Sequence, residues 1–293
     1  MTRIFLVLCT NVAVLALLYL VLFALEAAFG VHVSGPGIGG LLLFAAVFGF
    51  GGALISLALS KWIAKRALRM HVLDRARSEP EAWLLSTVRQ LARRAGIRAP
   101  EVGIFESATM NAFATGPRRD SALVAVSTGL LAGMSRDEIE AVLGHELSHV
   151  ANGDMVTLTL LQGVLNTFVI FLARIIGSLV DRTVFRNDRG ESGLGFLLAS
   201  MTAQIVLGCI ASMIVCWFSR YREFRADRGG ASLAGTGNMI GALEALQRES
   251  GDALPAQIQA FGINTRAADG FLRLFMSHPP LAQRIAALRT GPA

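Results

Sequence analysis

Four long apolar runs alternate with polar segments along the chain. They cover residues 4–25, 38–59, 155–173 and 194–218. A helix needs about 20 mainly apolar residues to cross the hydrocarbon core of a bilayer, and each run is close to that length. The pattern therefore predicts an α-helical membrane protein with about four spans. Gln162, Asn166 and Gln204 interrupt the last two runs, so a full crossing and a re-entrant hairpin are both compatible with this pair.

The flanks of the runs indicate their orientation. Basic residues follow the second run and the fourth run; they are Lys61, Lys65, Arg66, Arg69, Arg75 and Arg77, and then Arg220, Arg222, Arg225 and Arg228. Because basic residues collect on the cytoplasmic side of a membrane, we expect both flanks in the cytoplasm. The third and fourth runs then begin and end on the same side, so the polar segments before and after this pair share one compartment.

Composition supports a membrane location and excludes one class of partner. Hydrophobic residues make up 53% of the chain and charged residues 16%, whereas about a quarter of the residues of a soluble domain are charged. The net charge of +6 suits an anionic membrane leaflet. The chain has no arginine-rich arm and no interleaved aromatic and basic residues, so we expect the lipid bilayer, and no nucleic acid, as a partner. Cys9, Cys209 and Cys216 lie in apolar runs and are expected to be small buried residues.

The polar segment after the second run carries signals for helices and strands. Ser78 with Glu81, and Ser135 with Glu138, have the spacing of capping boxes, each of which starts a helix. Short runs between turn residues predict strands at 102–105, 112–114 and 122–126. A mainly α domain with a small β-sheet is therefore expected in the cytoplasm.

The expected domain organisation alternates between membrane and cytoplasm. Residues 1–60 form an N-terminal transmembrane hairpin, and residues 155–218 form a second hydrophobic pair. Residues 61–154 and 219–293 supply the two parts of the cytoplasmic domain. The first run is longer than the apolar core of a signal peptide, about 7–15 residues, so we expect it to be kept as an anchor.

The helix that follows Ser135 carries the strongest chemical signal. His145, Glu146 and His149 form an H-E-x-x-H motif. Histidines four residues apart share one face of a helix and can bind zinc together, and the glutamate beside the first can act as a base toward water. This spacing is the signature of a zinc metalloprotease. Charged residues crowd the start of the helix, so we do not expect the helix itself to span the membrane.

A catalytic zinc ion needs a third protein ligand. Glu223 and Asp227 follow the fourth run and lie four residues apart, so on a helix they share a face. One carboxylate can bind zinc while the other holds a histidine, but four interspersed arginines fit a solvated salt-bridge helix equally well. Of the other histidines, His32 is expected outside the membrane, His71 lies in the basic flank, and His278 follows the last apolar run.

Several motifs together resemble one known family. They are H-E-L-S-H at 145–149, S-R-x-x-E-F-x-A-D at 219–227, S-H-P-P at 277–280, and Asn111-Ala112-Phe113 followed by Gly116. In this combination the chain resembles the HtpX family of bacterial membrane zinc endopeptidases, which is related to the CAAX prenyl protease. The resemblance covers nearly the whole chain, and no motif position departs from it.

The resemblance implies a role for each residue of the site. His145, His149 and Glu223 are implied as the ligands of one zinc ion per chain, with Glu146 as the general base and later proton donor. Asp227 is implied as a partner of a zinc-bound histidine. Stabilisation of the oxyanion is implied for His278 and Arg284, and binding of an extended substrate for Asn111, Ala112 and Phe113.

The resemblance also implies a cellular role. We expect a zinc endopeptidase of the bacterial inner membrane that cuts misfolded or damaged membrane proteins at the cytoplasmic face, in quality control under stress and in cooperation with other membrane proteases. A membrane zinc transporter or sensor without hydrolysis is the alternative from a different class. It would favour ligands inside the spans and would not need Glu146. A prenyl-protein processing enzyme is the nearer rival, and it would have more spans.

Overall fold

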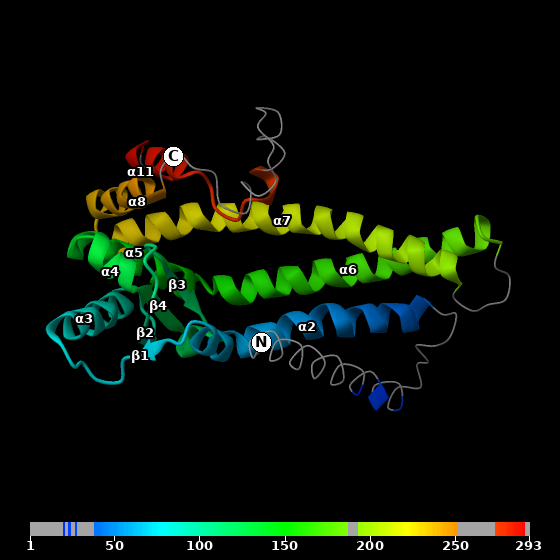
Figure 1. The fold of residues 1–293 in the computed structure, drawn as a ribbon, viewed down its shortest axis with the longest axis horizontal. Coiled ribbons are helices and arrows are strands. Elements are labelled where there is room, and N and C mark those ends of the chain that lie inside the picture. The colour runs from blue at the N-terminus through cyan, green and yellow to red at the C-terminus, as the bar shows by residue number, and fades with distance from the viewer. Residues whose placement is uncertain are drawn as a thin grey trace. The chain divides into compact units, whose positions relative to one another are not determined.

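The computed structural model describes residues 38–186, 193–250 and 273–290, and the isolated positions 20, 23, 24 and 27 (Figure 1). The first apolar run, 4–25, thus lies outside the described residues except at three positions. The other three apolar runs form helices, as expected. They are α2 (Ile38–Ala67), α6 (Asp154–Thr183) and α7 (Leu194–Ala234). In the described part of the chain, these are the three helices long and apolar enough to cross a membrane.

Helix α7 is longer than the run that predicts it. Its apolar part ends near Phe218, but the helix continues without a break through the charged segment that contains Glu223 and Asp227. Neither a glycine in a left-handed conformation nor a proline interrupts it. The apolar run and the expected ligand helix are therefore one element.

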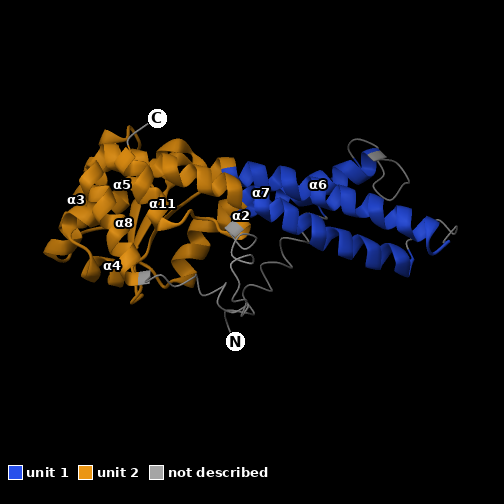
Figure 2. Cartoon of the chain, turned by 90° about the horizontal axis from the view of Figure 1, so that it is seen from above, with its two compact units in different colours: residues 1–56, 158–215 blue, residues 57–157, 216–293 orange. Residues whose placement is uncertain are grey.

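The chain divides into two compact units, which Figure 2 shows in blue and orange. Unit 1 comprises residues 1–56 and 158–215, and unit 2 comprises residues 57–157 and 216–293. Helices α2, α6 and α7 each contribute residues to both units. The four-segment domain division expected from the sequence stays a prediction.

Glycines allow the helices of unit 1 to approach one another closely. A Cβ atom on Gly49 of α2 would lie 2.6 Å from the backbone nitrogen of Thr167 in α6, and a Cβ on Gly177 of α6 would lie 3.0 Å from the carbonyl oxygen of Phe196 in α7. Small residues at helix crossings are typical of membrane helices, because packing in lipid depends on close contact.

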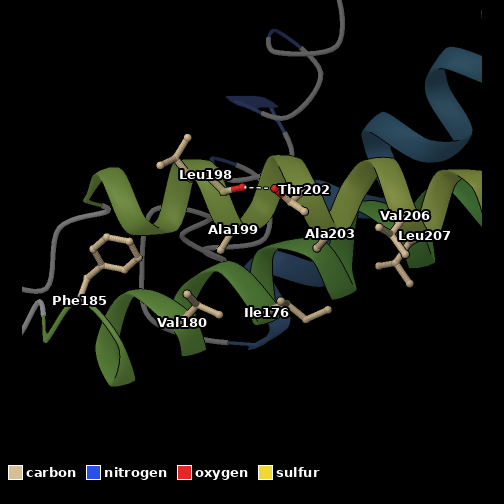
Figure 3. A pocket seen from close by; sticks show the side chains of 9 residues that line it. All are labelled: Ile176, Val180, Phe185, Leu198, Ala199, Thr202, Ala203, Val206 and Leu207. Carbon is tan, nitrogen blue, oxygen red and sulfur yellow. Dashed lines mark hydrogen bonds between the residues drawn. The ribbon is translucent and has the colours of Figure 1, made fainter.

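The distal parts of α6 and α7 enclose an apolar groove of about 530 Å³ (Figure 3). Ile176 and Val180 of α6 face Ala199 and Ala203 of α7 across it. Near the end of this groove the buried carboxylate of Asp181 accepts hydrogen bonds from the backbone nitrogens of Gly193 (3.0 Å) and Phe196 (3.1 Å), and so caps the start of α7.

The expectation of buried cysteines is wrong for Cys209. This side chain is exposed and Cys216 is partly exposed, while Cys9 lies outside the described residues. An apolar run does not show which of its side chains face protein, because apolar side chains are equally compatible with a lipid environment.

Unit 2 contains a four-stranded sheet. Its strands are β1 (His71–Val72), β2 (Glu101–Phe105), β3 (Ala112–Thr115) and β4 (Leu123–Ser127), in the order β1-β2-β4-β3. Strands β2 and β4 are parallel, and the other two pairs are antiparallel. The three strands expected from the sequence are confirmed, whereas β1 has only two residues and too short a pattern to predict. Within the described residues β3 lies at an edge of the sheet.

Helices pack against the sheet of unit 2 and against one another. They are α3 (Glu79–Arg94), the short α4 (Thr128–Gly133), α5 (Arg136–Asn152), α8 (Thr236–Ser250) and α11 (Leu281–Thr290), with 3₁₀ turns at Arg119–Ser121 and Arg273–Phe275. Ser78 caps α3, and Ser135 and Glu138 form a complete capping box at the start of α5, as predicted. Helix α5 contacts β3, β4, α3 and α8, and its buried Leu143 and Leu147 join the hydrophobic core.

Within unit 2, helices α5 and α7 cross at a point where each has a glycine. A Cβ on Gly144 of α5 would lie 3.3 Å from the Cα of Gly230 in α7. A Cβ on Gly230 would lie 2.9 Å from the backbone nitrogen of His145. Real Cβ atoms rarely come this close to backbone, so these glycines are needed for the observed spacing of the two helices.

We therefore predict that Gly230→Ala destabilises the protein. The added methyl must push α7 away from α5, and such overpacking lowers the free energy of unfolding by about 1–3 kcal/mol. Thermal unfolding of the detergent-solubilised protein measures the effect as a lower midpoint temperature. The matched control is Gly237→Ala on α8, where an added Cβ meets nothing within 4 Å. An equal midpoint in the two variants would contradict the packing argument.

Candidate metal centre

Three possible metal ligands from two helices converge in unit 2. His145 and His149 lie on α5 and Glu223 lies on α7. The two Nε2 atoms of the histidines are 3.2 Å apart. Glu223 completes the group, with Oε1 3.3 Å from Nε2 of His149 and Oε2 3.7 Å from Nε2 of His145. The structure thus brings the three expected zinc ligands together.

The geometry and chemistry of this group fit zinc. Tetrahedral zinc with bonds of about 2.0–2.1 Å holds its ligand atoms about 3.3 Å from one another. The three observed separations, 3.2, 3.3 and 3.7 Å, lie near that value. Two imidazoles and one carboxylate also form a known donor set for catalytic zinc, which leaves a fourth position for water or substrate.

A buried carboxylate orients the first histidine. Nδ1 of His145 donates a hydrogen bond to Oδ1 of Asp227 over 2.9 Å. Asp227 in turn accepts from Arg284 of α11, at 2.8 Å from Nε and 2.5 Å from Nη2. Arg284 also lies 3.3 Å from Glu223. The guanidinium is buried and lies against both carboxylates, whereas an arginine on a terminal helix would usually be solvated.

The second histidine has its own carboxylate partner, which the sequence did not indicate as a site residue. Nδ1 of His149 donates to Oδ2 of Asp154 over 2.7 Å. Asp154 comes directly after Gly153, whose φ of 67° ends α5 in a left-handed turn and returns the chain toward His149. Burial alone lowers the pKa of His149, but hydrogen bonds to Asp154 and Glu223 outweigh it and raise the pKa to about 9. In the sequence, the only sign of this contact is an acidic residue directly after the helix-ending Gly153.

Glu146 lies beside the three ligands on α5. Burial raises the pKa of its carboxyl above the usual range, and the nearby Glu223 charge raises it further. The two histidines and a hydrogen bond from the backbone of Ala114 in β3 oppose this shift. Glu146 is therefore held between the ligand group and the edge strand as a carboxyl group suited to exchanging protons.

A cavity of about 150 Å³ opens next to Glu146. It is lined by His145, Glu223, His278 and Arg284 on its polar side and mainly by residues of α4, α5 and α8 on its apolar side. The side chain of His278 is 64% exposed, and its Nδ1 lies 2.8 Å from Oε2 of Glu223. The structure thus brings His278 and Arg284 to the centre, while their roles toward an oxyanion stay predictions.

Of the three residues expected to bind substrate, two line the cavity and one does not. Asn111 and Ala112 line the cavity. Phe113 does not line it and instead packs against Phe105 of β2, with ring centroids 5.8 Å apart. His71 pairs with Ile104 in the sheet and takes no part in the metal group, and His32 lies outside the described residues.

A histidine pair and a carboxylate arranged for zinc, with a glutamate from the same helix beside them, define the site of a metallopeptidase. Residues 78–291 match Peptidase family M48, and the chain belongs to this family. It is 57% identical to Protease HtpX of Alkalilimnicola ehrlichii, over 99% of this chain and 98% of the relative, and 56% identical to Protease HtpX of Thioalkalivibrio sulfidiphilus, over 99% of both chains. The family match, these relatives and the apolar helices together support the conclusion that the protein is a membrane metalloprotease.

A solved structure supports the fold. The chain resembles the crystal structure of S. mikatae Ste24p with a TM-score of 0.67 and 20% sequence identity. The similarity covers 98% of this chain and 65% of the Ste24p chain. At this identity the match establishes a shared fold and nothing about substrates.

We predict that Glu223→Ala lowers the zinc content of the purified protein well below one ion per chain. The variant loses the oxygen ligand from α7 and keeps only the two imidazoles of α5. Metal analysis after dialysis against zinc-free buffer measures the effect. Glu244→Ala on α8 is the control, because Glu244 pairs with Arg289 at the surface. An unchanged zinc content in Glu223→Ala would remove Glu223 from the metal centre.

Proposed function

We propose that the protein is a zinc endopeptidase of the bacterial inner membrane. It hydrolyses peptide bonds of misfolded or damaged membrane proteins at the cytoplasmic face and so serves membrane-protein quality control, in cooperation with other membrane proteases. One observation carries the proposal: Glu146 lines a single cavity beside the edge strand β3 together with His145 and Glu223, two of the three residues of the ligand group. A transporter needs neither a proton-exchanging carboxyl at its ligands nor a strand edge beside them.

The residues of the centre divide the hydrolysis between them. His145, His149 and Glu223 would hold the zinc ion, which when bound would act as a Lewis acid toward water and a carbonyl group. The Glu146 carboxylate accepts a proton from the attacking water and later donates it to the leaving amine. Its raised pKa suits this exchange, because a group that must both take and release a proton works best with a pKa near the operating pH.

The edge strand offers a way to hold the substrate. Strand β3 pairs with β4 on one side, and an extended peptide can add to its other side through backbone hydrogen bonds. Ala114 of this strand already bonds to Glu146, and Ala112 borders the cavity. A peptide on β3 therefore runs past the carboxyl that moves the proton.

The cavity favours an apolar side chain next to the cleaved bond. Its apolar lining includes Met110, Leu130, Val142, Met239 and Leu243. A cavity of this size has room for a group as large as benzene. Segments of damaged membrane proteins are rich in such side chains, which fits the proposed substrate class.

His278 and Arg284 complete the proposal at the polar wall. The imidazole of His278 is exposed and its Nδ1 lies 2.8 Å from Oε2 of Glu223, so the ring stands beside the ligand group, where it can donate to the oxygen of a carbonyl under attack. Arg284 adds positive charge beneath the same wall while it braces Asp227 and Glu223. Both residues would stabilise negative charge that develops on that oxygen.

The orientation rests on charge. Lys61 and Lys65, in the last turns of α2, pair with Glu101 of β2 at 2.6 and 2.5 Å, and further arginines follow both α2 and the apolar part of α7. Basic residues at these ends favour the cytoplasm for unit 2.

We predict that Glu146→Gln retains zinc and loses at least about 10²-fold in cleavage rate, since general acid–base catalysis contributes about that much or more. Zinc analysis and cleavage of an unfolded membrane protein in detergent micelles are measured on the same preparation. Glu140→Gln, on the same helix, is the control and should cleave at the wild-type rate. Full cleavage by Glu146→Gln would refute the mechanism, and zinc uptake into proteoliposomes without cleavage would support a transporter.

A further inference from the structure

Asp154 connects three parts of unit 2 although it belongs to none of the expected site motifs. It is the first residue of α6, and its side chain is 1% exposed. Oδ2 accepts from His149 at 2.7 Å, and Oδ1 is ion-paired with Arg225 of α7. Its backbone oxygen accepts from Nη1 of Arg222 at 2.8 Å. From the start of α6, the polar groups of this single residue thus contact the last turn of α5 and the part of α7 that carries Glu223.

The contact to His149 decides which ring nitrogen is available to a metal. A carboxylate that accepts from Nδ1–H holds the proton on that nitrogen, so the lone pair of Nε2 is left for a metal. Asp227 does this for His145, and Asp154 stands in the same relation to His149. The two Nε2 atoms accordingly point to one place, 3.2 Å apart.

The contacts of Asp154 to Arg222 and Arg225 also help to position Glu223, the third ligand. Arg222 is buried and directly precedes Glu223, and it binds the backbone of Asp154. Arg225 lies two residues beyond Glu223 and pairs with the carboxylate of Asp154. Asp154 therefore fixes the part of α7 that carries Glu223 relative to His149. Asp154 is the first residue of α6, the helix that continues into the apolar segment.

We propose that Asp154 is a positioning residue for the metal centre, which holds His149 in its metal-binding orientation and anchors the ligand group to the start of α6. The inference rests on the proposed zinc site and deepens it. Losing such a partner of a metal-bound histidine typically weakens metal affinity by about 10–100-fold.

The test measures metal binding by the full-length protein in detergent, without a substrate. Zinc affinity is obtained by competition with a chromophoric chelator, and the geometry of the centre by the visible absorption spectrum of the cobalt(II)-loaded protein. Asp154→Ala should weaken zinc affinity about 10–100-fold and change the cobalt spectrum. Asp154→Asn, which keeps an acceptor oxygen of the same size, should recover part of the affinity.

Two comparison variants separate this role from general stability and from the zinc site itself. Arg136→Met removes an exposed ion pair with Glu79 at the start of α5, the helix that carries His149. Its affinity should stay within about threefold of the wild type, since an exposed ion pair contributes little. Equal losses of affinity in Arg136→Met and Asp154→Asn would overturn the proposal, as would a wild-type affinity and spectrum in Asp154→Ala. If Glu223→Ala also binds zinc normally, the zinc site is wrong; if only the Asp154 variants do, the site stands and the positioning role fails.

Discussion

The close crossing of α5 and α7 is the constraint on which the centre depends. Gly144 and Gly230 face each other without side chains, so the two backbones come near enough for short polar contacts. Glu223 lies seven residues before Gly230, about two turns along the same face of α7. The crossing therefore carries Glu223 to the two imidazoles, and a wider spacing would leave three separate polar residues in place of one metal centre.

This crossing also requires that buried charge be balanced. Asp154, Asp227 and Glu223 are all nearly inaccessible to water, and a buried carboxylate without partners is strongly destabilising. Each has a histidine on one side and an arginine on another. Among the buried side-chain atoms of the described residues, Nε of Arg222 is the one without a hydrogen-bond partner. Of the four arginines of this segment, Arg222 and Arg225 thus contact Asp154 beside the centre, whereas Arg228 is exposed.

Patterns within one helix were enough to predict much of this arrangement. The H-E-x-x-H spacing, the two capping boxes and the three main strands all follow from local periodicity. Spacing and the pair of apolar runs after His149 placed Glu223 and Asp227 on one helix face in the same compartment, but only the family resemblance singled out Glu223 as a ligand. Asp154 and the burial of Arg284 do not follow. Asp154 reaches His149 only because Gly153 adopts a left-handed turn, and Arg284 reaches Asp227 from a helix 57 positions away. Residue spacing predicts which side chains are neighbours on one helix or strand. It does not predict contacts between separate elements.

The order of the proposed metal ligands along the chain has a consequence for biosynthesis. His145 and His149 precede α6 and α7, whereas Glu223 follows the apolar part of α7. A nascent chain that has emerged as far as α6 holds only two of the three donors. The centre is completed only after both apolar helices of the pair have been translated. An unfinished chain therefore has no assembled site with which to cut other proteins during its own synthesis.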